Sequence, residues 1–466
     1  MLGMGNMRQW LMNISLVGGW FPAAAFAVIV VLSVTLLVSA AVSKRDGRIL
    51  ATVLPIGVAA VSGMVGYVVA WLLSDVFVVF GVGLGSRVMS WVAAGFAIAG
   101  FAIVHIVLSR GMMRVAAAIL TVFAILAAAI GIDQSYGEYA TIGSLFGEDS
   151  YSQADLTGLA KRKDLITVAQ WRKQAANGTI RNIPANGTVN KIDIPATKSQ
   201  FEARKALVYL PPAALADSKR KPALPVVLML SGQPGSPGRV FQAGGIQTMM
   251  DGYAKTHDGL APIVIAADQL GADSHNTLCV DSKVYGNALT YLTQDVVDWV
   301  KTNLPAAQDA KDWAIAGFSQ GATCSLQIGV NHPDLFGTMI PTDSEIKPTN
   351  GSRQEMIDRF FDGDTTAYEN QVPVNAIRNH APTHQMLIIG AGEKDTTSIR
   401  NVKTIAPVAA KAGMRVAAVE SSGNAHDWHA VQDVLRYGLA VFGHDTGLDG
   451  ANPNLSDYPN LKRITI

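Results

Sequence analysis

The chain has 466 residues and a net charge of +1, and 49% of its residues are hydrophobic. A charge so close to zero argues neither for nucleic-acid binding nor for an acidic partner. Only nine of the 37 basic and 36 acidic residues lie among the first 132 positions. This uneven distribution predicts a membrane domain followed by one large globular domain.

Four long apolar segments occupy the first part of the chain. They cover residues 17–43, 49–73, 88–108 and 115–132. Each is long enough to cross about 30 Å of hydrocarbon as a helix, and none keeps a polar face for water. We therefore predict an all-α domain of four transmembrane helices over residues 1–132, with the lipid bilayer as its partner.

Basic residues in the short loops predict the orientation of these helices. Lys44, Arg45 and Arg48 lie between the first two spans, and Arg110 and Arg114 lie between the last two. Because positively charged loops remain in the cytoplasm, an even number of spans places the rest of the chain outside. We expect a multi-pass protein of the cell membrane with an extracytoplasmic globular domain.

The composition also predicts the character of two linking segments. The loop 74–87 is unusually apolar, and it either lies in the outer membrane interface or packs against the helices. Residues 133–185 are polar and predict a connector with one short helix near residues 165–176.

Strand and helix patterns alternate beyond the connector. Strands are predicted at 188–194, 203–210, 225–230, 263–267, 313–316, 338–340, 385–389 and 415–419, and helices at 240–255, 289–302, 320–331, 399–412 and 428–441. Continuous apolar strands between amphipathic helices indicate a mostly parallel sheet covered on both faces. We predict an α/β catalytic domain over 186–445 and a C-terminal tail over 446–466, with the chemistry at the carboxyl ends of the strands.

The strongest functional signal is a serine between two glycines. The run Ala314-Ile315-Ala316-Gly317-Phe318-Ser319-Gln320-Gly321 leads from an apolar strand directly into a helical pattern. G-x-S-x-G between a strand and a helix is typical of a nucleophile elbow, whose crowded turn leaves no room for side chains beside the serine. We predict that Ser319 is the nucleophile and that the backbone N–H of Gln320 helps to bind the oxyanion.

A serine nucleophile needs a base and an orienting acid. His426 lies between the last predicted strand and the last predicted helix, and His429, one helical turn later, is the second candidate for the base. Asp395 lies in a glycine-rich loop after the penultimate strand; Glu393 competes with it, and Asp395 could instead cap the next helix. The order Ser319, Asp395, His426 is that of the α/β-hydrolases.

The second oxyanion donor is expected from the loop that follows the first buried strand, Ser231-Gly232-Gln233-Pro234-Gly235. The backbone N–H of Gln233 is the predicted donor, and Gly232 is the small residue that permits close approach. A plain turn is the alternative interpretation of this loop.

Residues 353–381 are long enough to cap the pocket. Three aromatic side chains in this segment, Phe360, Phe361 and Tyr368, either contact an acyl chain or form the packed core of the cap.

The two cysteines, Cys279 and Cys324, both lie in the domain predicted to be extracytoplasmic, where an oxidising environment permits a disulfide. They either pair or remain as two separate buried thiols. Neither has neighbours typical of a metal site, and we expect no metal and no cofactor.

Several motifs resemble the esterase D family of α/β-hydrolases, which includes the mycolyltransferases of mycobacterial cell walls. The resemblance covers about residues 188–442 and rests on Leu230-Ser231-Gly232-Gln233, Thr290-Tyr291-Leu292-Thr293-Gln294-Asp295-Val296, Ala316-Gly317-Phe318-Ser319-Gln320-Gly321, Asn331-His332-Pro333-Asp334-Leu335-Phe336 and His426-Asp427-Trp428. The run Cys279-Val280-Asp281-Ser282, with Cys324, is similar to that of actinobacterial members that carry N-terminal membrane helices. The resemblance implies the triad Ser319, Asp395 and His426.

The chain departs from the mycolyltransferases at Ser231, where those enzymes usually carry an aspartate. The resemblance is therefore compatible both with ester hydrolysis and with transfer of the acyl group to another acceptor. Our hypothesis is a membrane serine esterase that acts on an acyl ester, with an envelope lipid as the expected substrate. The alternatives are an acyltransferase that uses the same triad and a membrane scaffold that has the fold without the activity.

Overall fold

The computed structural model describes residues 4–42, 48–77, 84–149, 151–160, 162–180, 182–218 and 220–466. Contacts divide the chain into two compact units, one of residues 1–148 with 425–427 and one of residues 149–424 with 428–466. The apolar loop 74–87 falls partly on residues 78–83, which lie outside the described residues.

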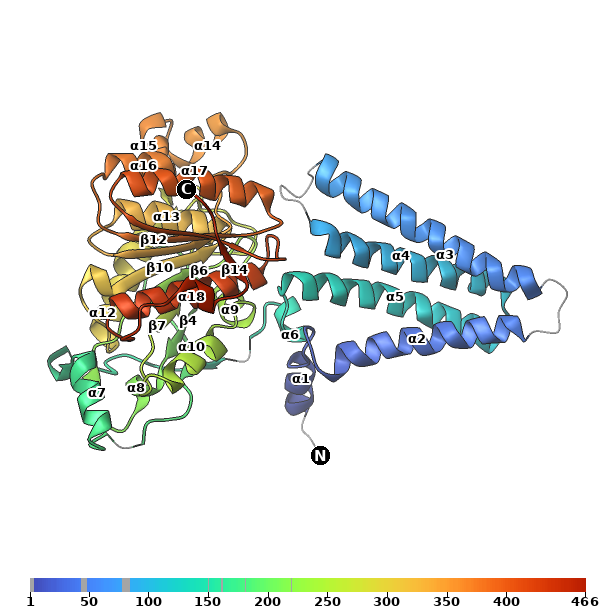
Figure 1. The fold of residues 1–466 in the computed structure, drawn as a ribbon, viewed down its shortest axis with the longest axis horizontal. Helices are drawn as coiled ribbons and strands as arrows, with labels where there is room; N and C mark the ends of the chain where they lie inside the picture. The colour runs from blue at the N-terminus through green and yellow to red at the C-terminus, as the bar shows by residue number, and fades with distance from the viewer. Residues whose placement is uncertain are drawn as a thin grey trace. The chain divides into compact units, whose positions relative to one another are not determined.

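Long helices make up the first unit (Figure 1). Its described helices are α1 (Met4–Met12), α2 (Trp20–Ala41), α3 (Arg48–Trp71), the π-helical extension of α3 (Leu72–Val76), α4 (Gly85–Leu108), α5 (Met112–Tyr136) and α6 (Ile142–Leu145). Within the described residues, four helices are long and apolar enough to cross a membrane, and they correspond to the four predicted spans. The prediction of an all-α N-terminal domain is confirmed.

The surface of these helices suits lipid better than water. Val30, Val31, Val61, Val122 and Ile125 are each more than 60% exposed. Apolar side chains in contact with water cost roughly 25 cal/mol per Å², a cost that hydrocarbon removes. Such an exposed apolar surface is consistent with helices that could span a membrane.

Close helix packing in this unit depends on small residues. A Cβ added at Gly100 of α4 would overlap the Ser62 hydroxyl of α3, and one added at Gly95 would lie 2.8 Å from the Cβ of Ala128 in α5. Small residues let membrane helices approach closely enough for van der Waals attraction to hold them together.

The second unit is built on one large sheet. Across its described residues, ten strands run in the order β1 (Ser152–Gln153), β3 (Thr188–Ile192), β4 (Ala206–Leu210), β7 (Ile263–Ala266), β6 (Val226–Leu230), β10 (Trp313–Phe318), β11 (Thr338–Thr342), β12 (Met386–Gly392), β13 (Arg415–Ser421) and β14 (Leu461–Arg463). The strands from β7 to β13 are mutually parallel, whereas β4 and β14 pair antiparallel with their neighbours. Two small sheets, β2 (Leu165–Ile166) with β5 (Lys221–Pro222) and β8 (Asp281–Ser282) with β9 (Gly286–Asn287), lie outside it.

Helices cover both faces of this sheet (Figure 1). One core contains side chains of α12 (Val296–Asn303), α13 (Gln320–Asn331), α16 (Pro373–Asn379) and α17 (Thr396–Lys411); the other contains side chains of α9 (Pro237–Gln242), α10 (Ile246–Lys255) and α18 (Trp428–Asp445). Strand β6 serves both cores, because Val226 and Leu228 enter the first while Val227 and Met229 enter the second. A strand buried on both faces reads as a continuous apolar run, which is why the pattern predicted a mostly parallel sheet.

The remaining described helices are short. They are α7 (Val168–Ala176), α8 (Pro212–Leu215), α11 (Ala288–Thr290), α14 (Arg353–Phe360) and α15 (Thr365–Glu369), with a π-helical turn (Tyr291–Asp295) and 3₁₀ turns (Arg162–Asp164, Ala310–Asp312, Leu455–Asp457). The prediction of one continuous helix over 240–255 is wrong. The helix breaks before α10 because Gly245 has φ of 61°, and a Cβ at Gly244 would overlap the carbonyl oxygen of Val240.

Candidate functional site

Ser319 lies in a strained turn between β10 and α13. Its φ is 55° and its ψ is −117°, a conformation that costs a residue with a side chain about 1–3 kcal/mol. A Cβ at Gly317 would overlap the carbonyl oxygen of Gly321, and a Cβ at Gly321 would overlap the backbone of Ser231. The two glycines are therefore required by space, as expected for a nucleophile elbow.

Gly317→Ala is expected to destabilise the second unit by about 3 kcal/mol, because the added methyl group has no room in the turn. Gly252→Ala is the matched control, since nothing lies within 4 Å of a Cβ at that helical position. The control is expected to raise stability by up to about 1 kcal/mol. Thermal unfolding of both variants checks this, and equal melting temperatures would contradict the crowded turn.

The loop after β6 lies against the nucleophile. A Cβ at Gly232 would be 3.2 Å from the ring of Phe318 and 3.5 Å from the Cβ of Ser319. Gly232, the small residue predicted at this position, therefore lets the loop approach Ser319 closely. Gln233 is the next residue, so its backbone belongs to the segment nearest Ser319, and its role as oxyanion donor stays a prediction.

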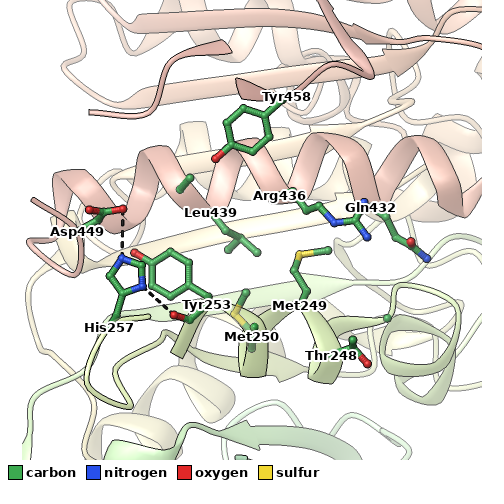
Figure 2. A pocket seen from close by; sticks show the side chains of 13 residues that line it. Thr248, Met249, Met250, Tyr253, His257, Gln432, Arg436, Leu439, Asp449 and Tyr458 are labelled. Atoms are coloured by element: carbon green, nitrogen blue, oxygen red, sulfur yellow. Dashed lines mark hydrogen bonds and ion pairs between the residues drawn. The ribbon is translucent and has the colours of Figure 1, made fainter. Parts of the chain in front are cut away.

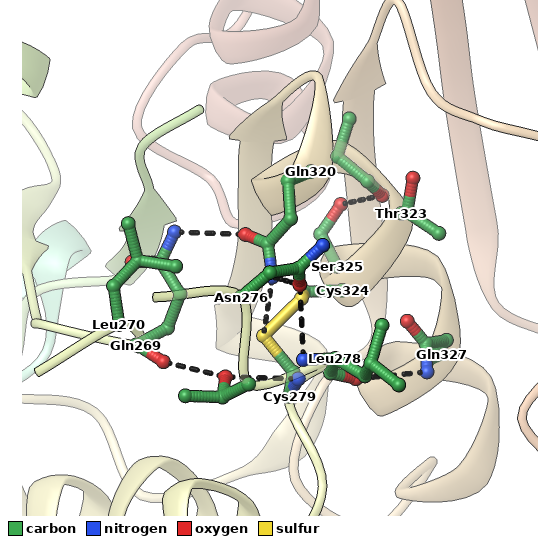
Figure 3. The surroundings of a disulfide bond; sticks show 12 residues. Gln269, Leu270, Asn276, Leu278, Cys279, Gln320, Thr323, Cys324, Ser325 and Gln327 are labelled. Atoms are coloured by element: carbon green, nitrogen blue, oxygen red, sulfur yellow. Dashed lines mark hydrogen bonds between the residues drawn. A yellow bond between two sulfur atoms is a disulfide. The ribbon is translucent and has the colours of Figure 1, made fainter. Parts of the chain in front are cut away.

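A buried amide joins this loop to the elbow, and Figure 3 shows its contact with Gln320. The side chain of Gln269, fully buried, donates to the carbonyl oxygen of Ser231 at 2.7 Å and to Oε1 of Gln320 at 3.2 Å. The Nε2 group of Gln320 in turn lies 3.3 Å from Oδ1 of Asn276 and 3.7 Å from Sγ of Cys279. These contacts hold together the two segments that carry the predicted oxyanion donors.

Cys279 and Cys324 form a disulfide, so the pairing interpretation holds and the alternative of separate thiols is wrong. The bond ties the loop after β7 to the first turns of α13, four residues beyond Gln320 (Figure 3).

Removing the disulfide is expected to lower the unfolding free energy by about 4 kcal/mol, because the bond closes a 45-residue segment. Thermal unfolding of Cys279→Ala/Cys324→Ala checks this against the wild type with and without reductant. Reductant should lower the melting temperature of the wild type and leave the variant unchanged. The wild type could be shown to be reduced and still melt at the same temperature as without reductant. That result would contradict the stabilising role of the disulfide.

An ion pair positions the far end of the loop after β6. The guanidinium of Arg204 makes hydrogen bonds of 2.8–2.9 Å to both carboxylate oxygens of Asp268, donates to the carbonyl oxygen of Gly235 at 2.9 Å, and also contacts Asp273. Burial alone would lower the pKa of Arg204, but its hydrogen bonds and charge interactions with Asp268 and Asp273 raise the pKa above its usual value. Arg204 is thus a fixed cation that anchors the loop.

Arg204→Ala is expected to destabilise the fold by about 3–5 kcal/mol, because Asp268 would keep a buried charge without its partner. The neighbouring Lys205→Ala is the control; its exposed ion pair with Asp193 contributes at most about 1 kcal/mol. Chemical unfolding measures both. If Arg204→Ala lowers the free energy of unfolding by no more than Lys205→Ala does, the anchoring role of Arg204 is contradicted.

The structure brings the predicted acid and base together. One ring nitrogen of His426, in the loop between β13 and α18, and one carboxylate oxygen each of Asp395 and Asp343 all lie within 4.8 Å of one another. Asp395 is also the N-cap of α17, because its Oδ1 accepts from the N–H groups of Thr397 and Ser398 at 3.1 and 3.0 Å. The capping role considered for Asp395 is therefore present alongside its proximity to the histidine.

The competing acid, Glu393, has other partners. Its exposed carboxylate accepts from the N–H of Gly423 at 2.7 Å and from Nζ of Lys462 at 2.9 Å. These two contacts, the backbone hydrogen bond first, lower the pKa of Glu393. This arrangement favours Asp395 over Glu393 beside the histidine.

Comparison with known proteins decides the family. Residues 198–438 match the Esterase family model, described as "Putative esterase". The chain belongs to this esterase family. An uncharacterized protein of Corynebacterium glutamicum is 32% identical over 333 residues, which cover 70% of this chain and 74% of that protein.

Some solved structures are similar to part of this chain at low sequence identity. An S-formylglutathione hydrolase from Agrobacterium tumefaciens is 16% identical, with a TM-score of 0.46, over 57% of this chain and 98% of its own. MPT51 of Mycobacterium tuberculosis is 14% identical, with a TM-score of 0.40, over 55% of this chain and 98% of its own. The Esterase family match and the mostly parallel sheet with helices on both faces confirm the predicted α/β-hydrolase fold class and the expectation of an esterase.

The aromatic residues of the esterase's cap segment are packed. Phe360 and Tyr368 are 3% and 1% exposed and pack with Leu278 and Val280 of the loop beside the disulfide, while Phe361 packs against the same cluster. These aromatic side chains form the packed core of the segment, which was one of the two interpretations drawn from the sequence.

A second histidine–carboxylate pair in the esterase lies in a different place. A groove of about 680 Å³ between α10 and α18 contains His257, whose Nε2 is 3.2 Å from Asp449 and whose Nδ1 is 2.7 Å from the carbonyl oxygen of Tyr253 (Figure 2). Both ring nitrogens therefore have partners, and none of the described residues that line the groove is a predicted nucleophile or acid. This pair has the contacts of a structural link between the end of α10 and the segment after α18.

Sequence patterns missed three residues of the site: Asp343, Arg204 and Gln269. Asp343 follows β11 directly, so the rule that chemistry gathers at the carboxyl ends of parallel strands could have found it. Arg204 and Gln269 carry no local signal, since their partners lie on other segments of the chain.

Proposed function

We propose that this protein is a membrane-anchored serine esterase that acts outside the cytoplasm through Ser319, His426 and Asp395. The Oγ of Ser319 attacks the ester carbonyl while His426 takes its proton and then passes that proton to the departing alcohol. Water, activated by the same histidine, attacks the acyl-enzyme and releases the acid. Asp395 orients the imidazole, and the backbone amides of Gln233 and Gln320 stabilise the oxyanion.

The observation that carries this proposal is the conformation of Ser319. A positive φ at a serine between two glycines that have no room for a Cβ is costly. Such strain is retained where it exposes a nucleophile at the head of a helix. The group of His426, Asp395 and Asp343 at the ends of neighbouring strands supports the same interpretation.

Two observations support an extracytoplasmic location. The disulfide between Cys279 and Cys324 is of a kind that persists in oxidising environments. Five of the seven basic residues among the first 132 positions lie in or beside the connections that follow the first and third spans, which favours a cytoplasmic position for those connections.

An envelope lipid ester is the substrate class that fits a hydrolase carried by apolar helices. Purified full-length protein and Ser319→Ala would be incubated with a total envelope lipid extract and the lipids compared by mass spectrometry. We expect the wild type alone to release free acid from one ester class. An acylated acceptor formed faster than free acid would replace hydrolysis with acyl transfer, and identical lipid profiles would contradict the proposal.

A further inference from the structure

Asp343 is a buried carboxylate between the nucleophile and the acid. It follows β11, is 0% exposed and has φ of 55°, a conformation that favours glycine, asparagine or aspartate. The carbonyl oxygen of Thr342, the residue before it, accepts from the backbone N–H of Ser319 at 3.1 Å. Asp343 is therefore linked through one peptide group to the nucleophile itself.

The same residue is bonded to the end of β12, the strand that leads to Asp395. Its backbone N–H donates to the carbonyl oxygen of Gly390 at 2.9 Å, and its Oδ1 accepts from the N–H of Gly392 at 2.9 Å. These bonds fix the carboxylate in the space where one of its oxygens, one oxygen of Asp395 and one ring nitrogen of His426 lie within 4.8 Å of one another.

One acid is enough to orient an imidazole and to stabilise the positive charge that it acquires during attack. Here two carboxylates approach the same ring. Burying a second carboxylate beside the first is unfavourable because the like charges repel and because both lose water. The proximity of a histidine that becomes positively charged in the reaction offsets this cost.

We propose that Asp343 is a second positioning residue for His426, able to orient the imidazole when Asp395 cannot. The inference rests on the proposed function and names a residue that the Ser319, His426, Asp395 mechanism does not need. Asp343 acts through the histidine and has no contact with substrate in this account.

Asparagine substitutions test the inference with little change in shape. At position 395, asparagine is also a good N-cap, so α17 should begin normally. At position 343, the amide oxygen can still accept from Gly392, and asparagine tolerates a positive φ. Asp364→Asn, at the exposed N-cap of α15, is the matched control for loss of a capping carboxylate.

The experiment measures hydrolysis of p-nitrophenyl butyrate by full-length Asp395→Asn, Asp343→Asn and the double variant in detergent. Replacing a sole orienting acid by its amide costs about 10⁴-fold in kcat. We expect Asp395→Asn alone to lose less than about 100-fold and the double variant to lose about 10⁴-fold, with each single variant melting near the wild type. Asp343→Asn should then cost far more in the Asp395→Asn background than in the wild type.

A purely structural role for Asp343 predicts a different pattern, in which its substitution reduces kcat by the same factor in both backgrounds. A loss of about 10⁴-fold in Asp395→Asn alone would overturn the inference even if Asp343→Asn fails to fold. Labelling of the wild type by a fluorophosphonate separates the two claims. If the probe labels the wild type and Asp395→Asn alone loses about 10⁴-fold in kcat, only the role of Asp343 is contradicted. If the probe does not label the wild type, both the proposed function and the inference are contradicted.

Discussion

Ser319→Ala is expected to lower kcat for ester hydrolysis by about 10⁶-fold and to leave the fold intact. The hydroxyl is the group that forms the acyl-enzyme, so no other side chain of the site can replace it. Alanine has a smaller side chain and does not add to the crowding of the turn. Hydrolysis of p-nitrophenyl butyrate by matched amounts of folded protein measures the loss.

Ser325→Ala is the control for this variant. Ser325 lies in α13, the helix that begins after Ser319. It is fully buried and donates to the carbonyl oxygen of Ala322 at 2.8 Å. Its replacement should cost about 1 kcal/mol of stability and leave kcat within a few-fold of the wild type. Activity that survives in Ser319→Ala would require another nucleophile.

His426→Ala is expected to reduce kcat by a similar factor, about 10⁶-fold, because base and nucleophile act as one unit. His426 has a ring nitrogen within 4.8 Å of Asp395 and Asp343, whereas His429 is the second residue of α18. The loss should therefore follow His426 and not its neighbour.

His429→Ala is the matched control, with an expected kcat within a few-fold of the wild type. Measurement of kcat for the two variants side by side decides between the two histidines considered from the sequence. A large loss at His429 with activity retained at His426 would reverse the assignment of the base.

Local patterns predicted the strands and the elbow well, because both depend on neighbouring residues. Strand β6 is a continuous apolar run, and α13 begins and ends where its helical pattern does. The glycines around Ser319 are explained by contacts within the turn and with the adjacent strand. The four helices that could span a membrane were predicted from length and apolar composition alone.

Long-range neighbours could not be predicted in the same way. The approach of Asp343 to Asp395 and His426 depends on β11 and β12 being adjacent, and strand order is not encoded in any local pattern. Arg204 reaches Gly235 only because β4 pairs with β7 and β7 with β6. The break before α10 was missed because two glycines inside an amphipathic pattern do not by themselves end a helix.

Peptide mapping of the full-length wild type after reaction with a fluorophosphonate probe would identify the nucleophile itself. Such probes form a covalent bond with an activated serine, and mass spectrometry identifies the residue that carries the adduct. We expect a single adduct, on Ser319. An adduct on another residue, or no adduct on protein shown to be folded, would contradict the role of Ser319 as nucleophile.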